Sequence, residues 1–335
     1  MSEPQPMVRC LFRAIASPLA GAPTLSARTY YPALYSGELQ QRNTGLLPAA
    51  RDRAPYPVAI LMPGINVSPD AYGWLAMALV NAGFVAMTYG WIVEEMPGLP
   101  ALSPGLDIGA LAPDVYGSRP SATALSAVIE DLATQNLTGT LTDCLDLDRI
   151  LLGGHSAGGS VALFNARPDW FPGLRAVFSY GSHCKASTML GYPPETYLPL
   201  SDALPTLMLG GDRDGVIAAS AFRYGGGNTD GDDVPDPVGP LQRSFDDALT
   251  RTAGDSHLAI IRGANHFSAS WPEDPSTGRP FLDWATTRDD SEIHDDIAGL
   301  VSDFARARVL DDPRADTRLR QRLSDPARIG HHATR

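Results

Sequence analysis

The sequence has few cysteines and no long hydrophobic run. Cys10, Cys144 and Cys184 are widely spaced and form no Cys-x-x-Cys pair, so they predict neither a disulfide framework nor a zinc site. No apolar run approaches the ~18 residues that a membrane-spanning helix needs. Residues 1–20 lack the basic flank and apolar core of a signal peptide, and we therefore expect a cytoplasmic protein with free thiols.

Positive charge is also scarce. The chain has 26 basic and 38 acidic residues, which gives a formal net charge of -12, and Lys185 is its only lysine. This balance disfavours nucleic acid or an anionic membrane as a partner. The hydrophobic fraction of 44% and the charged fraction of 19% are ordinary for a globular protein, and 335 residues are enough for one large core.

Short apolar runs alternate with amphipathic stretches, which predicts an α/β fold with a mostly parallel sheet of about eight strands flanked by helices. We expect strands at 8–15, 25–31, 58–62, 84–88, 149–152, 176–180, 206–209 and 258–261. The last six are nearly continuous in apolar residues, as is typical of strands buried on both faces, whereas the first two suit an antiparallel edge. Helices are expected at about 68–81, 121–136, 157–167, 241–251 and 291–309.

Three segments interrupt this alternation within a single domain predicted over residues 1–310. Residues 94–119 and 181–204 are rich in proline and glycine without periodicity, so we interpret them as lid or pocket insertions. Residues 225–240 form an acidic, glycine-rich loop. Residues 311–335 are predicted to be a charged tail outside the domain core.

The most specific motif is Gly154-His155-Ser156-Ala157-Gly158, which lies between a predicted strand and a predicted helix. That context is typical of a nucleophile elbow, a sharp turn that needs small neighbours and lifts the serine hydroxyl above the sheet. Ser156 would then stand at a helix N-terminus, where backbone N–H groups face a developing negative charge. A glycine-rich turn with an incidental serine is the alternative interpretation.

A serine becomes a good nucleophile when a base removes its proton. His266 follows the predicted strand 258–261 and is the best placed of the seven histidines, because its rival His183 would precede the acid in the chain. The acid should come between serine and histidine, after strand 206–209. Asp212 and Asp214 both lie there, and spacing alone does not separate them. The order serine, aspartate, histidine is the order of the α/β-hydrolases.

These residues resemble the α/β-hydrolase superfamily over roughly residues 58–305. The motifs are most similar to those of the chlorophyllase, dienelactone-hydrolase and bacterial cutinase-like groups. They are Pro63-Gly64, the Gly-His-Ser-Ala-Gly-Gly run 154–159, the Gly211-x-x-Asp214 turn and the Ala-Asn-His-Phe run 264–267. Two departures stand out: dienelactone hydrolases carry cysteine at the position of Ser156, and bacterial cutinases are secreted and usually shorter.

The resemblance implies several roles for residues of this chain. It implies Asp214 as the acid, with Asp212 as the alternative, and the backbone N–H groups of Ile65 and Ala157 as the oxyanion hole. We therefore expect a serine hydrolase that cleaves a hydrophobic small-molecule carboxylic ester through an acyl-enzyme, without a cofactor or a catalytic metal. A thioesterase or acyltransferase would use the same residues, and a non-catalytic binding protein is a remote alternative.

Aromatic and apolar residues near the predicted carboxyl ends of strands are candidates for the substrate pocket. They are Trp91, Met96, Tyr116 and Trp271. Ordinary packing of the insertions explains them equally well.

A separate acidic run has the spacing of a calcium loop. Asn228, Asp230, Asp232 and Asp236 present oxygens at positions 1, 3, 5 and 9 and resemble the repeats of thrombospondin type. However, Asp233 replaces the usual glycine at position 6, and a glycine occupies the usual acidic position 12. A solvated acidic loop is therefore the main alternative to structural calcium.

Overall fold

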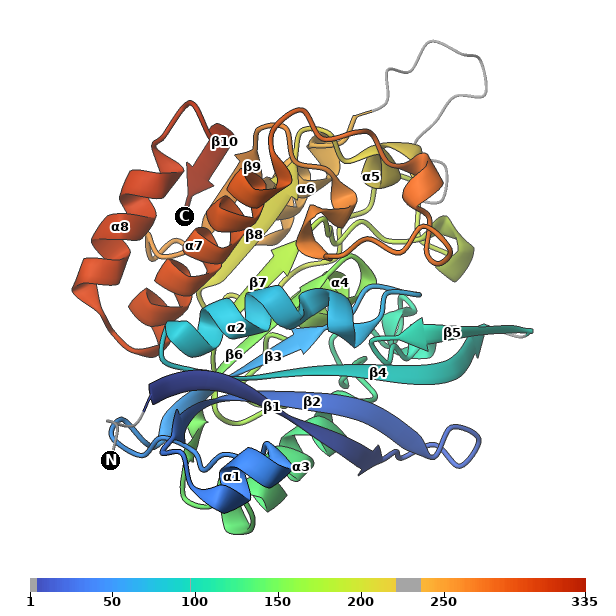
Figure 1. Cartoon of the computed structure of the whole chain (residues 1–335). Helices are drawn as coiled ribbons and strands as arrows, with labels where there is room; N and C mark the ends of the chain where they lie inside the picture. The colour runs from blue at the N-terminus through green and yellow to red at the C-terminus, as the bar shows by residue number, and fades with distance from the viewer. Residues whose placement is uncertain (1–4, 97, 221–235) are drawn as a thin grey trace.

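The computed structural model describes residues 5–96, 98–220 and 236–335 of the chain. Within those ranges ten strands form a sheet in the order β1-β2-β4-β3-β6-β7-β8-β9-β10, with β5 paired to β4 (Figure 1). The strands are β1 (Gln5–Ala16), β2 (Thr24–Tyr35), β3 (Tyr56–Met62), β4 (Val85–Met96), β5 (Leu99–Ser103), β6 (Leu145–His155), β7 (Leu174–Tyr180), β8 (Thr206–Gly211), β9 (His257–Ile261) and β10 (Ile329–Thr334).

The parallel strands of the sheet are the buried ones at its centre. The central strands β4, β3, β6, β7, β8 and β9 run parallel to one another, while β1, β2, β5 and β10 pair antiparallel. All seven residues of β3 are buried, because helices cover both faces of a parallel sheet. The predicted fold class, with an antiparallel edge formed by the first two strands, is confirmed.

Helices form a layer on each face of the sheet. They are α1 (Leu39–Thr44), α2 (Gly73–Asn81), α3 (Leu125–Leu137), α4 (Ala157–Phe164), α5 (Gly215–Ala219), α6 (Gly239–Arg243), α7 (Asp290–Val309) and α8 (Pro313–Leu323). Val58 and Ile60 of β3 pack in the core cluster of α3 and α4, whereas Ala59 packs in that of α2 and α7. In Figure 1, α2 and α7 lie side by side in front of the sheet. No helix in the described ranges has the length and apolar character to cross a membrane.

The C-terminal segment differs from its prediction as a charged tail. Residues 313–323 form α8 against α7, and residues 329–334 form β10 against the outer edge of β9 (Figure 1). The apolar stripe of α8 is narrow, because it consists of Ala315, Leu319 and Leu323 among arginines. An edge strand such as β10 needs few apolar residues. Both elements therefore look like a tail in the sequence, although they belong to the folded body.

The two predicted insertions have different structures. Residues 94–119 contain the end of β4, the antiparallel strand β5 and a short 3-10 turn at Ile108–Leu111. Residues 181–204 contain a 3-10 turn at Thr188–Leu190 and an isolated bridge between Lys185 and Tyr197. The hydroxyl of Tyr116 donates to the carbonyl of Pro199 at 2.7 Å, so the two segments contact each other.

Candidate active site

Three side chains from three strand ends meet at the carboxyl edge of the sheet. Ser156 follows β6, Asp214 follows β8, and His266 follows β9. The Nε2 atom of His266 lies 3.0 Å from the Oγ of Ser156, and its Nδ1 lies 2.8 Å from the Oδ2 of Asp214. Because β6, β8 and β9 run in the same direction, their ends bring these residues together across more than a hundred positions of sequence.

The turn at Ser156 has the geometry of an elbow. Ser156 has φ of 55° and ψ of -125° and directly precedes α4. A Cβ on Gly154 would lie 2.5 Å from the carbonyl oxygen of Gly158, and one on Gly158 would lie 2.4 Å from that of Met62. The flanking glycines are therefore required by close approach of the backbone, and the resulting strain at Ser156 exposes its hydroxyl above the sheet.

The structure separates the two candidate aspartates by their contacts. Asp214 is fully buried and accepts the N–H of Ile217 at 2.8 Å through Oδ1, which leaves Oδ2 to His266. Asp212 instead accepts the N–H of Gly263 at 2.7 Å. The Gly211-x-x-Asp214 turn thus places the second aspartate, not the first, against the imidazole.

Gly181 lies directly against the contact between His266 and Asp214. It has φ of 58°, and an added Cβ would lie 2.9 Å from Nδ1 of His266 and 3.1 Å from Oδ2 of Asp214. Sequence reasoning missed this residue, although its position immediately after β7 was a usable signal. A side chain at this position would press on the hydrogen bond that orients the imidazole.

The predicted oxyanion loop lies beside the elbow, because Met62 at the end of β3 pairs with Gly154 of β6. The N–H of Gly64 donates to the hydroxyl of Tyr72 at 2.9 Å, so it is occupied. The N–H groups of Ile65 and Ala157 have no acceptor within the described ranges. A Cβ on Gly64 would lie 3.3 Å from the Cβ of Ser156, so the loop closely approaches the serine.

Tyr72, which no sequence motif indicates, holds this loop to the elbow. Its buried hydroxyl also lies 2.9 Å from the Nδ1 of His155, the residue before the serine. Burial raises the pKa of Tyr72. Burial, with the charge of His266 as a lesser cause, lowers the pKa of His155 well below its ordinary value. Both groups are therefore neutral at ordinary pH, and they act through hydrogen bonding.

The predicted pocket residues lie in different parts of the structure. Trp91 is fully buried in the core, and its indole N–H donates to the carbonyl of Ala22 at 2.9 Å, so the expectation that it lines the pocket is wrong. Tyr116 packs edge-on against Phe164 of α4. Trp271 is 53% exposed and contacts the ring of His294 on α7. The side chain of Met96 lies outside the described part of the structure.

The predicted calcium loop falls mostly outside the described residues. Asn228, Asp230 and Asp232 lie there, while Asp236 accepts the N–H groups of Val238 and Gly239 at 2.9 Å each. In the described ranges no group of three or more histidine, cysteine, aspartate or glutamate side chains is arranged to hold a metal ion. The three cysteines are free thiols.

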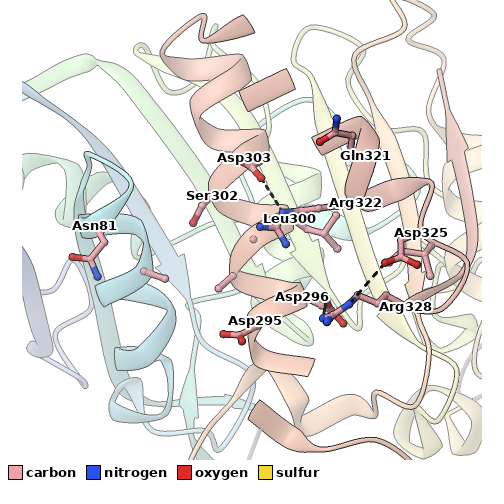
Figure 2. A pocket seen from close by; sticks show the side chains of 14 residues that line it. Asn81, Asp295, Asp296, Leu300, Ser302, Asp303, Gln321, Arg322, Asp325 and Arg328 are labelled. Carbon is pink, nitrogen blue, oxygen red and sulfur yellow. Dashed lines mark hydrogen bonds and ion pairs between the residues drawn. The ribbon is translucent and has the colours of Figure 1, made fainter. Parts of the chain in front are cut away.

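A further cavity lies elsewhere, beside α2, α7 and α8 (Figure 2). It has a volume of about 780 Å³. Asp303 on α7 pairs with Arg322 of α8 at 2.9 Å, and Asp296 pairs with Arg328 at 2.6 Å, as the dashed lines show. These ion pairs neutralise the two buried carboxylates, whereas the partner of Asp214 is an imidazole.

Comparisons with known proteins bear on the fold. No protein-family model matches the sequence, and no curated protein matches it. Among solved structures, a ferulic acid esterase from Streptomyces cinnamoneus matches with a TM-score of 0.55 and 18% identity over 94% of each chain. The shared architecture is an α/β-hydrolase fold. The narrower resemblance to chlorophyllases, dienelactone hydrolases and bacterial cutinases stays a prediction.

Proposed function

We propose that the protein is a serine esterase that hydrolyses a carboxylic ester through an acyl-enzyme. The observation that carries the proposal is the continuous contact from Ser156 Oγ through His266 to the buried Asp214. Each residue of this chain of contacts assists the residue before it. The imidazole accepts the proton of a hydroxyl that is otherwise a weak nucleophile, and the carboxylate stabilises the imidazolium that forms.

The proposed reaction has two balanced halves. In the first, Ser156 Oγ attacks the ester carbonyl while His266 Nε2 takes its proton, and the same proton then passes to the departing alcohol. The N–H groups of Ile65 and Ala157 stabilise the oxyanion, and one such donor is typically worth about 3 kcal/mol. In the second half His266 activates a water molecule that releases the acid. Residues of the chain carry every proton and charge, so the reaction needs no cofactor.

A hydrophobic acyl or alcohol group is the substrate feature that best fits the surroundings. The lining of a cavity of about 170 Å³ includes Asn66, Val67 and Phe267. Asn66 follows the oxyanion donor Ile65, and Phe267 follows the base. One matching solved structure is a ferulic acid esterase. We therefore include aromatic acyl esters among the proposed substrates.

The test is hydrolysis of p-nitrophenyl esters and of methyl ferulate by the purified protein. Ser156→Ala should abolish turnover and labelling by a fluorophosphonate probe, with thermal stability nearly unchanged. Ser160→Ala is the matched control, because this hydroxyl lies one turn further along α4 and donates to the carbonyl of His183 at 2.9 Å. Turnover retained in Ser156→Ala would overturn the proposal, and acyl transfer to an alcohol in preference to water would reassign the reaction.

A further inference from the structure

A short segment after the histidine loop contacts both loops that carry the acid and the base. This segment, residues 282–285, is called the strap below. Its centre is Asp283, whose Oδ1 accepts the N–H of Gly215 at 2.9 Å and whose Oδ2 accepts the N–H of Phe267 at 3.1 Å. Gly215 directly follows Asp214, and Phe267 directly follows His266. One carboxylate therefore binds the two residues next to the proposed acid and base.

The other residues of the strap also contact both the loop of Asp214 and the loop of His266. On the acid side, the guanidinium of Arg213 lies 5.3 Å from the ring centre of Trp284, and its Nε donates to the carbonyl of Ala285 at 3.4 Å. On the base side, the amide of Asn265 donates to the carbonyl of Trp284 at 2.9 Å. These contacts surround the two hydrogen bonds of Asp283 and limit independent movement of the two loops.

Close packing explains why the connection is tight. A Cβ on Gly215 would lie 2.3 Å from the carbonyl oxygen of Leu282 and 2.8 Å from the backbone nitrogen of Trp284. Glycine is therefore what lets the strap reach the turn after Asp214. The imidazole can lie between Asp214 and Ser156 only if the β8 and β9 loops keep a fixed separation, and the strap spans that separation.

We propose that Asp283 is a positioning residue of the active site, which holds the Asp214 loop and the His266 loop together and places a second negative charge beside the imidazole. This inference rests on the proposed esterase function. Asp283 touches neither Ser156 nor the imidazole nitrogens, and it acts through the backbone of the two loops and through its charge. A displacement of about 1 Å between reacting groups is enough to slow a reaction about 100-fold.

The charged surroundings support the electrostatic part of this role. Burial, and next the charge of Asp214, raise the pKa of Asp283, while His266 acts in the opposite direction. Burial lowers the pKa of His155 well below its usual value, and it lowers that of His183 to about 4. Both rings are therefore neutral near neutral pH, so neither adds a positive charge beside the imidazole.

The test is Asp283→Asn, which keeps the size of the side chain but removes its charge and places a donor against backbone donors. We expect kcat to fall about 10- to 100-fold with KM nearly unchanged. The acid limb of the kcat/KM profile should move to lower pH, because the protonated imidazole loses a neighbouring negative charge. Fluorophosphonate labelling of Ser156 should slow in parallel. A purely structural role would not move the pH profile.

Asp312→Asn is the matched control, because Asp312 also accepts two backbone N–H groups, those of Arg314 and Ala315, at the start of α8. It should keep wild-type kinetics. If Asp283→Asn does not fold, Arg213→Ala releases the strap at Trp284 and Ala285, and it should lower kcat a few-fold. If Asp283→Asn folds and keeps wild-type kinetics, the proposed role of Asp283 is wrong, while the proposed esterase function stands. The same conclusion applies if Arg213→Ala is needed and keeps wild-type kinetics. A wild-type protein without turnover or Ser156 labelling overturns the proposed function as well.

Discussion

Two regions of the molecule hold buried carboxylates with different partners. At the carboxyl edge of the sheet, Asp214 contacts the imidazole of His266 and a backbone N–H. At the cavity beside α7 and α8, Asp296 contacts Arg288 and Arg328, and Asp303 likewise contacts two arginines. An arginine neutralises an aspartate permanently, whereas a histidine does so only when it gains a proton. Charge balance, rather than cavity size, therefore distinguishes a candidate catalytic acid from a structural one.

The sharpest test of this comparison exchanges one aspartate in each region for asparagine. Asp214→Asn should lower kcat/KM about 10³- to 10⁴-fold, because the imidazole loses the partner that fixes its tautomer and stabilises its charge. Asp296→Asn should leave kcat/KM unchanged and lower the free energy of unfolding by about 2 kcal/mol, because two arginines lose a charged partner. Ester kinetics and urea unfolding of both variants check the pair. Equal losses of kcat/KM in the two variants would show that the two carboxylates do not differ in their role.

The second test adds one methyl group to a glycine in each region. Gly181→Ala should lower kcat about 100-fold, because its Cβ would press on the contact between His266 and Asp214. Gly299→Ala should leave kcat unchanged, because its Cβ would meet the far end of the Arg322 side chain. Gly254→Ala controls for backbone strain, since it also has positive φ but open space around it. An active Gly181 variant would show that the contact tolerates displacement.

The third test concerns hydroxyl groups. Tyr72→Phe should lower kcat about 10-fold with little change in KM, because the N–H of Gly64 loses its acceptor and the oxyanion loop loses its link to His155. Tyr56→Phe is the control, because its hydroxyl donates to the carbonyl of Ala50 at 2.9 Å, away from the site. Comparable kinetic losses in the two variants would point to general destabilisation rather than to the loop.

The smallest expected effect is a pH dependence of the free energy of unfolding that is caused by His257. Burial, and next the charge of Arg308, lower the pKa of His257 to about 4. The unfolded chain, with an ordinary histidine pKa, therefore binds more protons between about pH 6.5 and that value, so stability falls as the pH is lowered through this window. Urea unfolding at about pH 7.5 and about pH 5.5 should differ by about 1 kcal/mol from this group. His257→Gln should remove that difference.

The sequence predicts those parts of the structure that follow from local chemistry. The central strands are recognisable because both of their faces are buried, and the elbow is recognisable because its turn requires glycine at fixed positions. By contrast, α8 and β10 bury few apolar side chains, so their pattern resembles that of a solvated tail. Trp91 lies just beyond the predicted strand 84–88, but β4 continues to Met96 and the indole of Trp91 is buried in the core.

The contacts of the site that the sequence does not reveal are all long-range. Tyr72 lies on the turn before α2 and reaches His155 of β6, while Asp283 reaches two loops whose residues Asp214 and His266 are 52 positions apart in the chain. No spacing rule connects such residues, because their proximity depends on how the sheet is assembled. The sequence predicts Ser156 from its motif and His266 from the known chain order, and it predicts Asp214 only through the resemblance of the Gly211-x-x-Asp214 turn.

The strap also determines where this protein tolerates change. The chain between the histidine turn and the strap is exposed from Trp271 to Thr277. Its first residue is anchored where the N–H of Trp271 donates to the carbonyl of Ala71 at 2.8 Å, and its end is anchored by Asp283. A loop with both ends fixed can be replaced at small entropic cost. Residues 272–281 therefore form a replaceable loop. New sequences in this loop could be selected for altered substrate preference while the reacting groups stay in place.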